Sequence, residues 1–352
     1  MSFITFENVG ILGISAVVPK NIVDNWNFAD IFTTQEIENT INTTGIGQRR
    51  FADEKICASD LCYEAALKLI KDLDLQKEDI DLLIFLSQTS DFHQPATAPI
   101  LQHRLGLPKT TGAFDINLAC SGYIYGLATA FSFVSQKDIN KVLLLVGETL
   151  SKIVSKKDRA TSLLFGDAGS ATIIKKNKKF GPSFFSMNSD GSGDWILKIS
   201  SGGYRNPTSI ENLKEKKYKD GSIRTDEQLF MDGMEVFNFT MREVPKDINK
   251  ILEYSNLNLD EIDYIIFHQA NKFITDFFIK KLKFPKEKVP YCLNKFGNTS
   301  AVSIPLTIVS ELKNEIINSN KKIILSGFGG GLSWGTTLLE LNNCYISDLL
   351  EV

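Results

Sequence analysis

The apolar residues of the chain follow two spacings that predict alternating strands and helices. Mostly apolar stretches at 9–17, 82–86 and 141–146 have the length of buried strands. Between the first two runs, the segment 59–73 carries apolar residues three and four positions apart, which predicts an amphipathic helix. Strands that are apolar on both faces are typical of a sheet covered by helices on each side. The pattern therefore predicts an α/β fold.

The second half of the chain repeats the order of the first. Residues 260–268 match 78–86 almost position for position, and 322–327 match 141–146 at nearly the same spacing. In each half we expect a strand, a small-residue turn and a helix to lie between the two matched strands. A repeat of this length indicates duplication, and it predicts a site where the strand ends of the two halves meet.

We therefore expect two similar halves, residues 1–175 and 176–352, packed against each other. Residues 190–226 break the repeat with several glycines, Pro207 and the charged run 211–219. This segment is expected to be a solvated excursion over the surface. A partner-binding segment is the alternative.

Residues 114–123 include a candidate nucleophile. An apolar, β-prone run ends at Cys120, small residues follow, and apolar residues then recur at helical spacing from 124 to 134. The pattern predicts strand, turn and helix, with Cys120 at the helix start. Unpaired N–H groups and the helix dipole would there lower the pKa of the thiol from about 8.5 toward neutrality. The alternative is a small buried cysteine without a chemical role.

Two polar residues of the second half are expected to join Cys120. The repeat places His268 at the end of a strand, and it places Asn298 close to the position equivalent to Cys120. Each alone is more often structural, but a pseudo-twofold axis would bring all three together in an apolar cleft. The glycine-rich run 327–331 is suited to presenting backbone N–H groups to an oxyanion. Close packing is the alternative reason for these glycines.

Composition narrows the class of protein. Of 352 residues, 43% are hydrophobic and 23% are charged, and the net charge of −3 argues against a general nucleic-acid binder. The five cysteines are scattered, odd in number and without metal-ligand spacing, which suits a reducing compartment. The sequence has no basic and apolar leader and no run of about 20 apolar residues. We therefore expect a cytoplasmic protein without a membrane span or a metal site.

Several motifs resemble those of β-ketoacyl-acyl-carrier-protein synthase III, a thiolase-fold condensing enzyme. They are Thr44-Gly45-Ile46 with Arg49-Arg50, Ala119-Cys120-Ser121-Gly122, Phe165 to Gly169, Met231 to Gly233, His268-Gln269-Ala270-Asn271, Gly297-Asn298-Thr299-Ser300 and Gly327 to Trp334. The resemblance runs from about Val9 to Leu341. Residues 342–352 extend past the usual end of the family, and the excursion is longer than typical.

The resemblance implies a fold, an assembly and a reaction. The fold would be thiolase-like, with duplicated halves in five layers, α-β-α-β-α, and mixed sheets. The protein would be a homodimer, with the apolar strand around 112–117 as an interface element. The reaction would be the decarboxylative Claisen condensation of an acyl thioester with a malonyl thioester to give a β-ketoacyl thioester. Coenzyme A or acyl-carrier protein would carry the substrates, in a fatty-acid-like or specialised pathway, with no metal or redox cofactor.

The resemblance also implies roles for four residues. Cys120 would take the acyl group, and the backbone N–H groups of Cys120 and Gly330 would hold the thioester oxyanion. His268 and Asn298 would donate hydrogen bonds to the malonyl thioester oxygen during loss of carbon dioxide. We therefore expect variants of His268 and Asn298 to retain acylation and to lose decarboxylation.

The coenzyme A site of the family is only partly matched. Arg159 matches an arginine that stacks on adenine, and Asn271 belongs to a cofactor-binding motif. Asn39 and Thr43 stand where the family has a tryptophan and a second arginine. Trp26 could stack on adenine instead if its loop were rearranged. The sequence therefore predicts that acyl-carrier protein delivers the donor as well as the malonyl group.

Two further replacements concern the carrier and the acyl pocket. Phe273 replaces the family's docking arginine, although Lys272 beside it could still meet an acidic carrier. Gln94 stands where the family often has a large apolar residue that closes the acyl pocket across the dimer. We expect a donor chain that is branched, polar or longer than acetyl.

Two other functions remain open from the sequence. The first is a family member that transfers its acyl group to an alcohol or amine without condensing, in specialised biosynthesis. The second is a catalytically inactive scaffold that binds acyl groups or carrier protein. The presence of Cys120, His268 and Asn298 together argues against the scaffold.

Overall fold

The computed structural model describes residues 2–352, which form two mixed β-sheets with helices between and outside them. The larger sheet has the strand order β17-β2-β8-β7-β5-β6, and β18 also pairs with β2. Its strands are β2 (Val9–Val18), β5 (Leu82–Leu86), β6 (Gly112–Ile116), β7 (Lys141–Thr149), β8 (Asp167–Lys176), β17 (Tyr345–Ile346) and β18 (Leu350–Glu351). β5, β6 and β7 are parallel, whereas β8 runs antiparallel to β7 and β2.

The smaller sheet has five strands in the order β1-β9-β16-β15-β14. They are β1 (Ser2–Phe6), β9 (Ser183–Ser189), β14 (Tyr264–Phe267), β15 (Asn320–Gly329) and β16 (Ser333–Asn342). β14 and β15 are parallel, as β5 and β7 are in the larger sheet, and β15 and β16 form an antiparallel pair like β7 and β8. The strand order of the sequence repeat is thus visible in both sheets.

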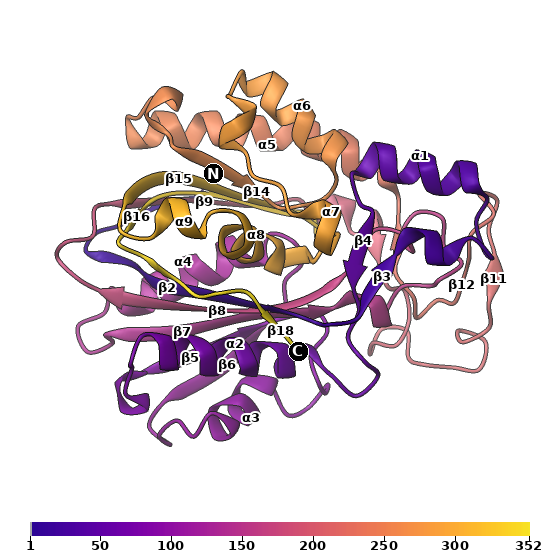
Figure 1. The fold of residues 1–352 in the computed structure, drawn as a ribbon. Coiled ribbons are helices and arrows are strands. Elements are labelled where there is room, and N and C mark those ends of the chain that lie inside the picture. The colour runs from indigo at the N-terminus through magenta and orange to yellow at the C-terminus, as the bar shows by residue number, and fades with distance from the viewer. Residues whose placement is uncertain (1) are drawn as a thin grey trace.

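The helices form three layers around the sheets, as Figure 1 shows. α4 (Gly122–Val134) and α8 (Ser303–Glu311) lie between the sheets and contact strands of both. α2 (Ala58–Asp72) and α3 (Thr97–Arg104) cover the outer face of the larger sheet, and α5 (Gly233–Ser255) and α6 (Lys272–Leu282) cover the smaller one. The short helices are α1 (Thr34–Thr44), α7 (Leu293–Phe296) and α9 (Lys313–Ile316). The expected α-β-α-β-α arrangement is confirmed.

The sequence of α4 explains its central position. Tyr123, Ile124, Leu127 and Phe131 are fully buried, and apolar residues surround almost the whole helix. A helix that is apolar on all sides must be covered on all sides. α4 satisfies this by packing between the two sheets, where it positions the residues just before its first turn.

Two expected strands differ from the structure. The strand before Cys120 ends at Ile116, four residues earlier than the apolar run suggests. In the second half, the segment before Asn298 forms the short helix α7 instead of a strand. In both places the residues just before the candidate site lie outside the two main sheets.

The ends of the chain cross the boundary that we expected at residue 175. β1, from the N-terminus, pairs antiparallel with β9 in the smaller sheet. β17 and β18, from the segment beyond residue 341, pair parallel with β2 in the larger sheet. Each sheet therefore contains strand residues from both halves of the sequence.

The excursion is ordered and lies largely at the surface. It contributes β10 (Leu197–Lys198), β11 (Lys216–Lys217) and β12 (Ile223–Arg224), and the following β13 (Phe230–Met231) pairs with β10. β3 (Ile22–Asp24) and β4 (Gln48–Arg50) form a further small sheet nearby. In Figure 1, β11 and β12 lie at the right-hand edge of the molecule, beneath α1.

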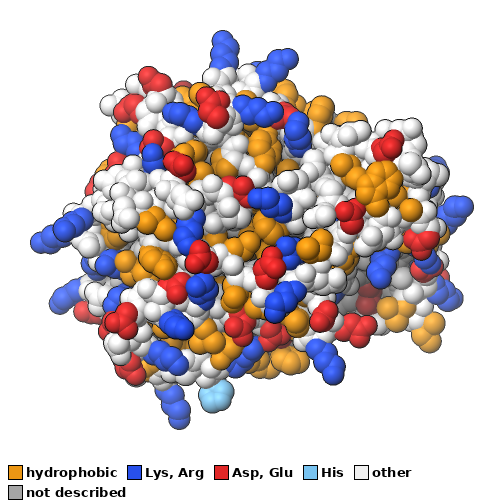
Figure 2. All heavy atoms as spheres, viewed as in Figure 1, with side chains coloured by type: hydrophobic (Ala, Val, Ile, Leu, Met, Phe, Trp, Pro, Cys, Tyr) orange, Lys and Arg blue, Asp and Glu red, His pale blue; other side chains and the backbone are white. Residues whose placement is uncertain are grey.

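The surface is mixed in charge. On the face drawn in Figure 2, basic and acidic side chains are interspersed, and apolar side chains occur in small groups. Among the helices of residues 2–352, none has the length and apolar character that crossing a membrane requires.

The C-terminal segment contributes to the core, and this generates a stability prediction. Ile346 on β17 is fully buried, whereas the side chain of the adjacent Tyr345 is 36% exposed. We expect Ile346→Ala to lower the free energy of unfolding by about 2–5 kcal/mol, because it leaves a cavity against the larger sheet. Tyr345→Ala is the matched control and should cost less than about 1 kcal/mol. Urea denaturation measures both, and equal effects would contradict the assigned position of the tail.

Candidate active site

Cys120 lines a cavity of about 340 Å³. It directly precedes Ser121, the residue that caps α4, and its side chain is buried. Most of the cavity wall is apolar and includes Leu118, Leu150 and Phe165. Among the residues that line the cavity, Cys120 is the only nucleophilic thiol.

The pKa of Cys120 contradicts the expectation from the sequence. Burial raises it to about 11, although hydrogen bonds from the Ser300 hydroxyl and from the backbone N–H groups of Cys120 and Gly330 lower it in part. Desolvation favours the neutral thiol and outweighs the position at the start of a helix. At neutral pH the resting residue is therefore a thiol, and a thiolate must be generated during the reaction.

Ser300 contacts all three residues that the sequence predicted to be catalytic. Its hydroxyl donates to Cys120 Sγ at 3.4 Å, and its backbone N–H donates to Asn298 Oδ1 at 2.9 Å. Its carbonyl oxygen lies 3.0 Å from His268 Nδ1. The residue has a φ of +53°, in the left-handed region that a serine rarely adopts. The structure thus brings Cys120, His268 and Asn298 together around one residue.

The hydrogen bonds of His268 determine its tautomer. Nδ1 lies 3.0 Å from the Ser300 carbonyl oxygen and 2.8 Å from Ser303 Oγ. A carbonyl oxygen can only accept, and the Ser303 hydroxyl itself donates to the same oxygen at 2.7 Å, so Nδ1 carries the proton. Burial lowers the pKa of His268 to about 4. The resting imidazole is therefore neutral, and Nε2 is a hydrogen-bond acceptor.

Asn298 is held by its backbone and by its side-chain oxygen. Its N–H donates to Leu164 O at 2.9 Å, and its carbonyl accepts from Gly166 N at 3.1 Å. Because Oδ1 accepts the Ser300 N–H, the side chain has its Nδ2 group left to donate. Asn298 and His268 are 6% and 2% exposed and do not line the cavity, which reaches Cys120 and Ser300 first.

The glycine run packs tightly against Cys120. A Cβ atom added at Gly329 would lie 2.7 Å from Cys120 Cβ and 2.9 Å from Sγ, so a side chain there would displace the thiol. The backbone N–H groups of Gly330 and of Cys120 itself help to lower the pKa of the Cys120 thiol. Close packing therefore accounts for Gly329, and the presentation of N–H groups to an oxyanion stays a prediction.

One wall of the cavity is the two-stranded ribbon of β10 and β13. Leu197 of β10 and the adjoining residues Ile199 and Leu229 line the cavity. Lys198 lines both this cavity and a separate surface pocket, to which Phe230, its partner across the ribbon, also belongs. The expected surface excursion therefore also shapes the candidate active site.

Arg159 does not line this cavity. It forms an ion pair with Glu36 of α1, and its backbone N–H donates to Ser222 Oγ at 3.0 Å. A Cβ atom at Gly221 would lie 2.8 Å from Arg159 Nε, so the excursion covers the guanidinium closely. The Arg159 side chain remains 41% exposed, so these neighbours cover it only in part.

Asn271 also lies outside the cavity lining. Its Oδ1 accepts the backbone N–H of Ile274 at 2.8 Å and so caps α6. Near the start of the same helix, Phe273 is 55% exposed and stacks on Phe237, with 5.4 Å between ring centres.

Gln94 is exposed in the loop between β5 and α3 and does not line the cavity of its own chain. Asn39 is exposed on α1, where its side chain accepts a hydrogen bond from Gln35 at 2.9 Å. Within residues 2–352, no group of three His, Cys, Asp or Glu side chains is arranged to hold a metal ion.

The sequence did not single out Glu148, which does not line the cavity but is hydrogen-bonded to a residue that does. This buried residue on β7 accepts hydrogen bonds from Gln88 N at 3.1 Å and from Thr89 Oγ1 at 2.8 Å. Gln88 lines the cavity. Burial raises the pKa of Glu148 to about 7, so it titrates near neutrality. A single acidic residue near the end of an apolar strand was the only signal for it in the sequence.

Two family models match the chain. The model described as 3-oxoacyl-[acyl-carrier-protein (ACP)] synthase III matches residues 114–192, which contain Cys120. The model described as 3-oxoacyl-[acyl-carrier-protein (ACP)] synthase III C terminal matches residues 252–341, which contain His268 and Asn298.

Several named proteins are similar to this chain in sequence or in structure. The beta-ketoacyl-[acyl-carrier-protein] synthase III of Fusobacterium nucleatum is 36% identical over 95% of this chain and 99% of its own. The Staphylococcus aureus protein of the same name is 39% identical, again over 95% of this chain and 99% of its own. The crystal structure of 3-oxoacyl-(acyl-carrier protein) synthase from Burkholderia xenovorans superposes with a TM-score of 0.93 at 37% identity, covering 100% of this chain and 99% of that one. The priming β-ketosynthase of the R1128 polyketide pathway gives 0.82 at 25% identity, covering 95% and 96%.

The titration of Cys120 can be measured directly. Because burial holds its pKa near 11, we expect alkylation by iodoacetamide to accelerate about tenfold per pH unit between pH 7 and 10. Ser300→Ala removes a hydrogen bond that lowers this pKa, so it should slow alkylation at every pH. Mass spectrometry of the peptide that contains Cys120 gives the rate, with Cys120→Ser as the blank. A plateau below pH 8 would show that the helix start outweighs burial.

Proposed function

Because the chain belongs to the β-ketoacyl-acyl-carrier-protein synthase III family, we propose that it condenses an acyl thioester with malonyl-acyl-carrier protein. The product is a β-ketoacyl thioester, and carbon dioxide is released. The enzyme is a transferase, and in the fatty-acid-like pathway expected of it no metal or redox cofactor takes part. The observation that carries the proposal is the set of Ser300 contacts that joins Cys120, His268 and Asn298.

In the first half-reaction, Cys120 takes the acyl group. The thiol proton passes to His268 Nε2, which is an acceptor in the resting tautomer. The sulfur attacks the thioester carbon, and the N–H groups of Cys120 and Gly330 hold the oxyanion. The bond to the carrier sulfur then breaks, and the departing thiolate takes a proton from water. His268 keeps its proton and now has an N–H at Nε2.

In the second half-reaction, the malonyl thioester loses carbon dioxide. Asn298 Nδ2 and the protonated His268 Nε2 donate hydrogen bonds to the thioester oxygen, where the enolate charge develops. The enolate carbon attacks the acyl group on Cys120 and forms the new carbon–carbon bond. The released Cys120 thiolate recovers its proton from His268, which restores the resting enzyme.

This cycle changes one expectation from the sequence. Both His268 and Asn298 were expected to serve only the second half-reaction. The tautomer of His268 adds a role in the first, because its unprotonated Nε2 can accept the thiol proton. Asn298 keeps its assignment to decarboxylation.

The division of labour between the two residues is testable. Asn298→Ala should acylate at a rate within about threefold of the wild type and lose at least about 10²-fold in release of carbon dioxide from the malonyl thioester. His268→Ala should slow both steps by about 10²-fold or more. Intact-mass spectrometry follows acylation, and the exposed Asn294→Ala on α7 is the control. Acylation lost in Asn298→Ala but kept in His268→Ala would contradict the assignment.

A homodimer and a cytoplasmic location complete the proposal. β6 is an edge strand of the larger sheet, and its residues are only half-buried in the single chain, which leaves a surface for a second copy. In such a dimer, the exposed loop of Gln94 could reach the partner's acyl pocket and favour a branched, polar or longer donor. The five cysteines are free, as suits a reducing compartment.

A non-condensing acyltransferase would need Cys120 as its nucleophile, but it would not need two hydrogen-bond donors at a malonyl thioester. Retention of both His268 and Asn298 around Ser300 therefore favours condensation. A scaffold without activity would need none of these contacts. Release of carbon dioxide from a malonyl thioester separates condensation from both alternatives.

We further propose that acyl-carrier protein delivers the donor. The ion pair of Arg159 with Glu36 and the close approach of Gly221 constrain the guanidinium that would stack on adenine, although the side chain is 41% exposed. Asn39 offers no aromatic ring on the opposite side. A coenzyme A thioester would have to displace these contacts, whereas a donor on carrier protein has no adenine to place.

We therefore expect the specificity constant for one acyl group to be at least about tenfold higher on carrier protein than on coenzyme A. Glu36→Gln keeps the N-terminal cap of α1 but weakens the hold on Arg159, so it should improve the coenzyme A donor selectively. Steady-state kinetics with both donors measures the ratio. Equal constants, or a preference for acetyl-coenzyme A, would refute delivery by carrier protein.

A further inference from the structure

Residues 200–226, which we call the excursion tip, form a projecting surface next to the cavity that reaches Cys120. Ile199, directly before the tip, and Leu229, just after it, both line that cavity. The tip therefore begins and ends at the cavity wall. Figure 1 shows its strands β11 and β12 away from the two main sheets.

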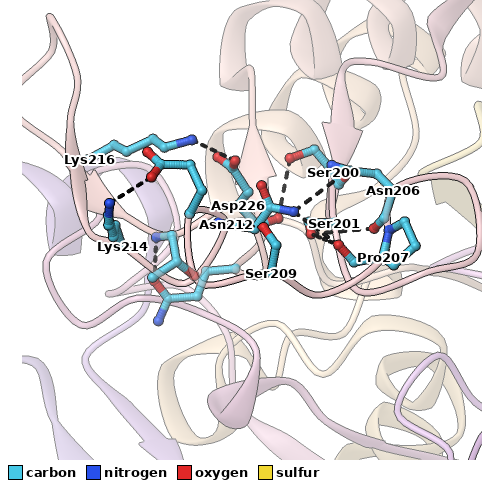
Figure 3. A network of polar contacts seen from close by, with 12 residues as sticks. Ser200, Ser201, Asn206, Pro207, Ser209, Asn212, Lys214, Lys216 and Asp226 are labelled. Atoms are coloured by element: carbon cyan, nitrogen blue, oxygen red, sulfur yellow. Dashed lines mark hydrogen bonds and ion pairs between the residues drawn. The ribbon is translucent and has the colours of Figure 1, made fainter.

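The tip is built as a rigid element. Figure 3 shows the hydrogen bonds that hold it. Asn206 Nδ2 donates to Ser200 O at 2.9 Å, and Asn212 Nδ2 donates to Pro207 O at 3.1 Å. The backbone N–H of Ser200 donates to the carbonyl of Asp226 at 3.1 Å, which closes the loop. Its surface side chains are therefore held on a preformed backbone.

A buried ion pair anchors the tip to the rest of the molecule. Arg224 Nη1 lies 2.9 Å from Asp158 Oδ2, and both side chains are more than nine-tenths buried. The guanidinium of Arg224 also lies 3.7 Å from the ring centre of Tyr218 and 4.8 Å from that of Phe230. Such a pair is costly to break because either charge would be left buried. The tip is thus fixed relative to the cavity.

Large apolar side chains nevertheless point into solvent from this rigid tip. Tyr204 is 95% exposed, Ile210 is 84% exposed and Leu213 is 53% exposed. Tyr204 and Ile210 have the highest exposed fractions of any large apolar residues among residues 2–352. They come from two adjacent turns, which Asn212 ties together through Pro207 and Asn206. Large apolar side chains that are this exposed on a fixed backbone favour a contact surface for another molecule.

The excursion tip contains more basic than acidic residues. Residues 200–226 carry six Lys and Arg residues and four Asp and Glu residues, in a chain whose net charge is −3. The ion pairs within residues 2–352 engage Glu211, Glu215 and Asp226, and Asp220 accepts a hydrogen bond from the Ser222 hydroxyl. Three exposed cations of the tip take part in none of these ion pairs: Arg205, Lys217 and Lys219.

We propose that the excursion tip is the docking surface for an acidic carrier protein, whose thioester arm then enters the cavity beside Ile199 and Leu229. Tyr204 and Ile210 supply the apolar contact, and Arg205 and Lys217 attract the acidic partner. The proposal rests on the proposed function for the identity of the partner. A rigid tip lowers the cost of ordering on binding, and its place at the cavity wall shortens the transfer of the arm.

The test uses two double variants of the full chain and a matched control. Tyr204→Ser with Ile210→Ser removes the apolar contact, and Arg205→Glu with Lys217→Glu reverses the charge. The control, Lys109→Glu with Lys178→Glu, makes the same charge change at exposed sites on other loops. The dissociation constant for an acidic bacterial acyl-carrier protein without an acyl group is measured by fluorescence anisotropy. The Michaelis constant is measured for malonyl groups on carrier protein and on coenzyme A.

We expect both tip variants to raise the dissociation constant and the Michaelis constant for the carrier-borne substrate about tenfold. The maximal rate, the constants for malonyl-coenzyme A and the control variant should not change. Added salt should weaken binding of the wild type more than that of the charge-reversed variant.

Three results would overturn the docking surface. The first is unchanged binding of carrier protein by the tip variants. The second is an equal rise in the Michaelis constant for malonyl-coenzyme A, which would mean that the variants distort the cavity wall. The third is dissociation of a dimer by the tip variants in light scattering, which would mean that the tip contacts a second copy of the chain. Failure of the proposed function would show separately, as carrier binding by the wild type without release of carbon dioxide.

Discussion

The backbone of Ser300 sets the geometry on which the candidate active site depends. At a φ of +53°, its hydroxyl, N–H and carbonyl groups face Cys120, Asn298 and His268 respectively. A left-handed conformation costs a non-glycine residue roughly 1–2 kcal/mol, so the surrounding contacts must maintain it. Those contacts come from both halves of the chain, since Cys120 precedes α4 and His268 follows β14. The two sheets must therefore pack in register before the three groups can meet.

Burial determines the charge state of this site. The same exclusion of water raises the pKa of Cys120 to about 11 and lowers that of His268 to about 4. Both shifts favour the neutral form, so the resting site contains no ion pair. In the proposed reaction, charge develops only when substrate is bound. A neutral resting site also protects the thiol from unwanted reactions with electrophiles.

The sequence predicted the layers, the repeat and the meeting of Cys120, His268 and Asn298, because each rests on a local apolar pattern or on the order of motifs. It misjudged the pKa of Cys120, since a helix start is visible in a sequence but the depth of burial is not. The roles of Ser300 and Glu148 were also missed. Ser300 acts through a backbone conformation. Glu148, on β7, accepts hydrogen bonds from the backbone of Gln88 and the hydroxyl of Thr89, which follow the neighbouring strand β5. Neither relation leaves a pattern along the chain.

The pairing of β17 and β18 with β2 has a consequence for how the protein is made. β2 leaves the ribosome long before β17 and β18, the strands that cover one of its edges. Throughout synthesis of the residues between them, that edge presents unpaired N–H and C=O groups to any neighbouring strand. Domains usually fold in order as they emerge. Here the larger sheet is completed only after β17 and β18 have been synthesised, so the growing chain exposes an edge open to wrong pairing until those strands arrive.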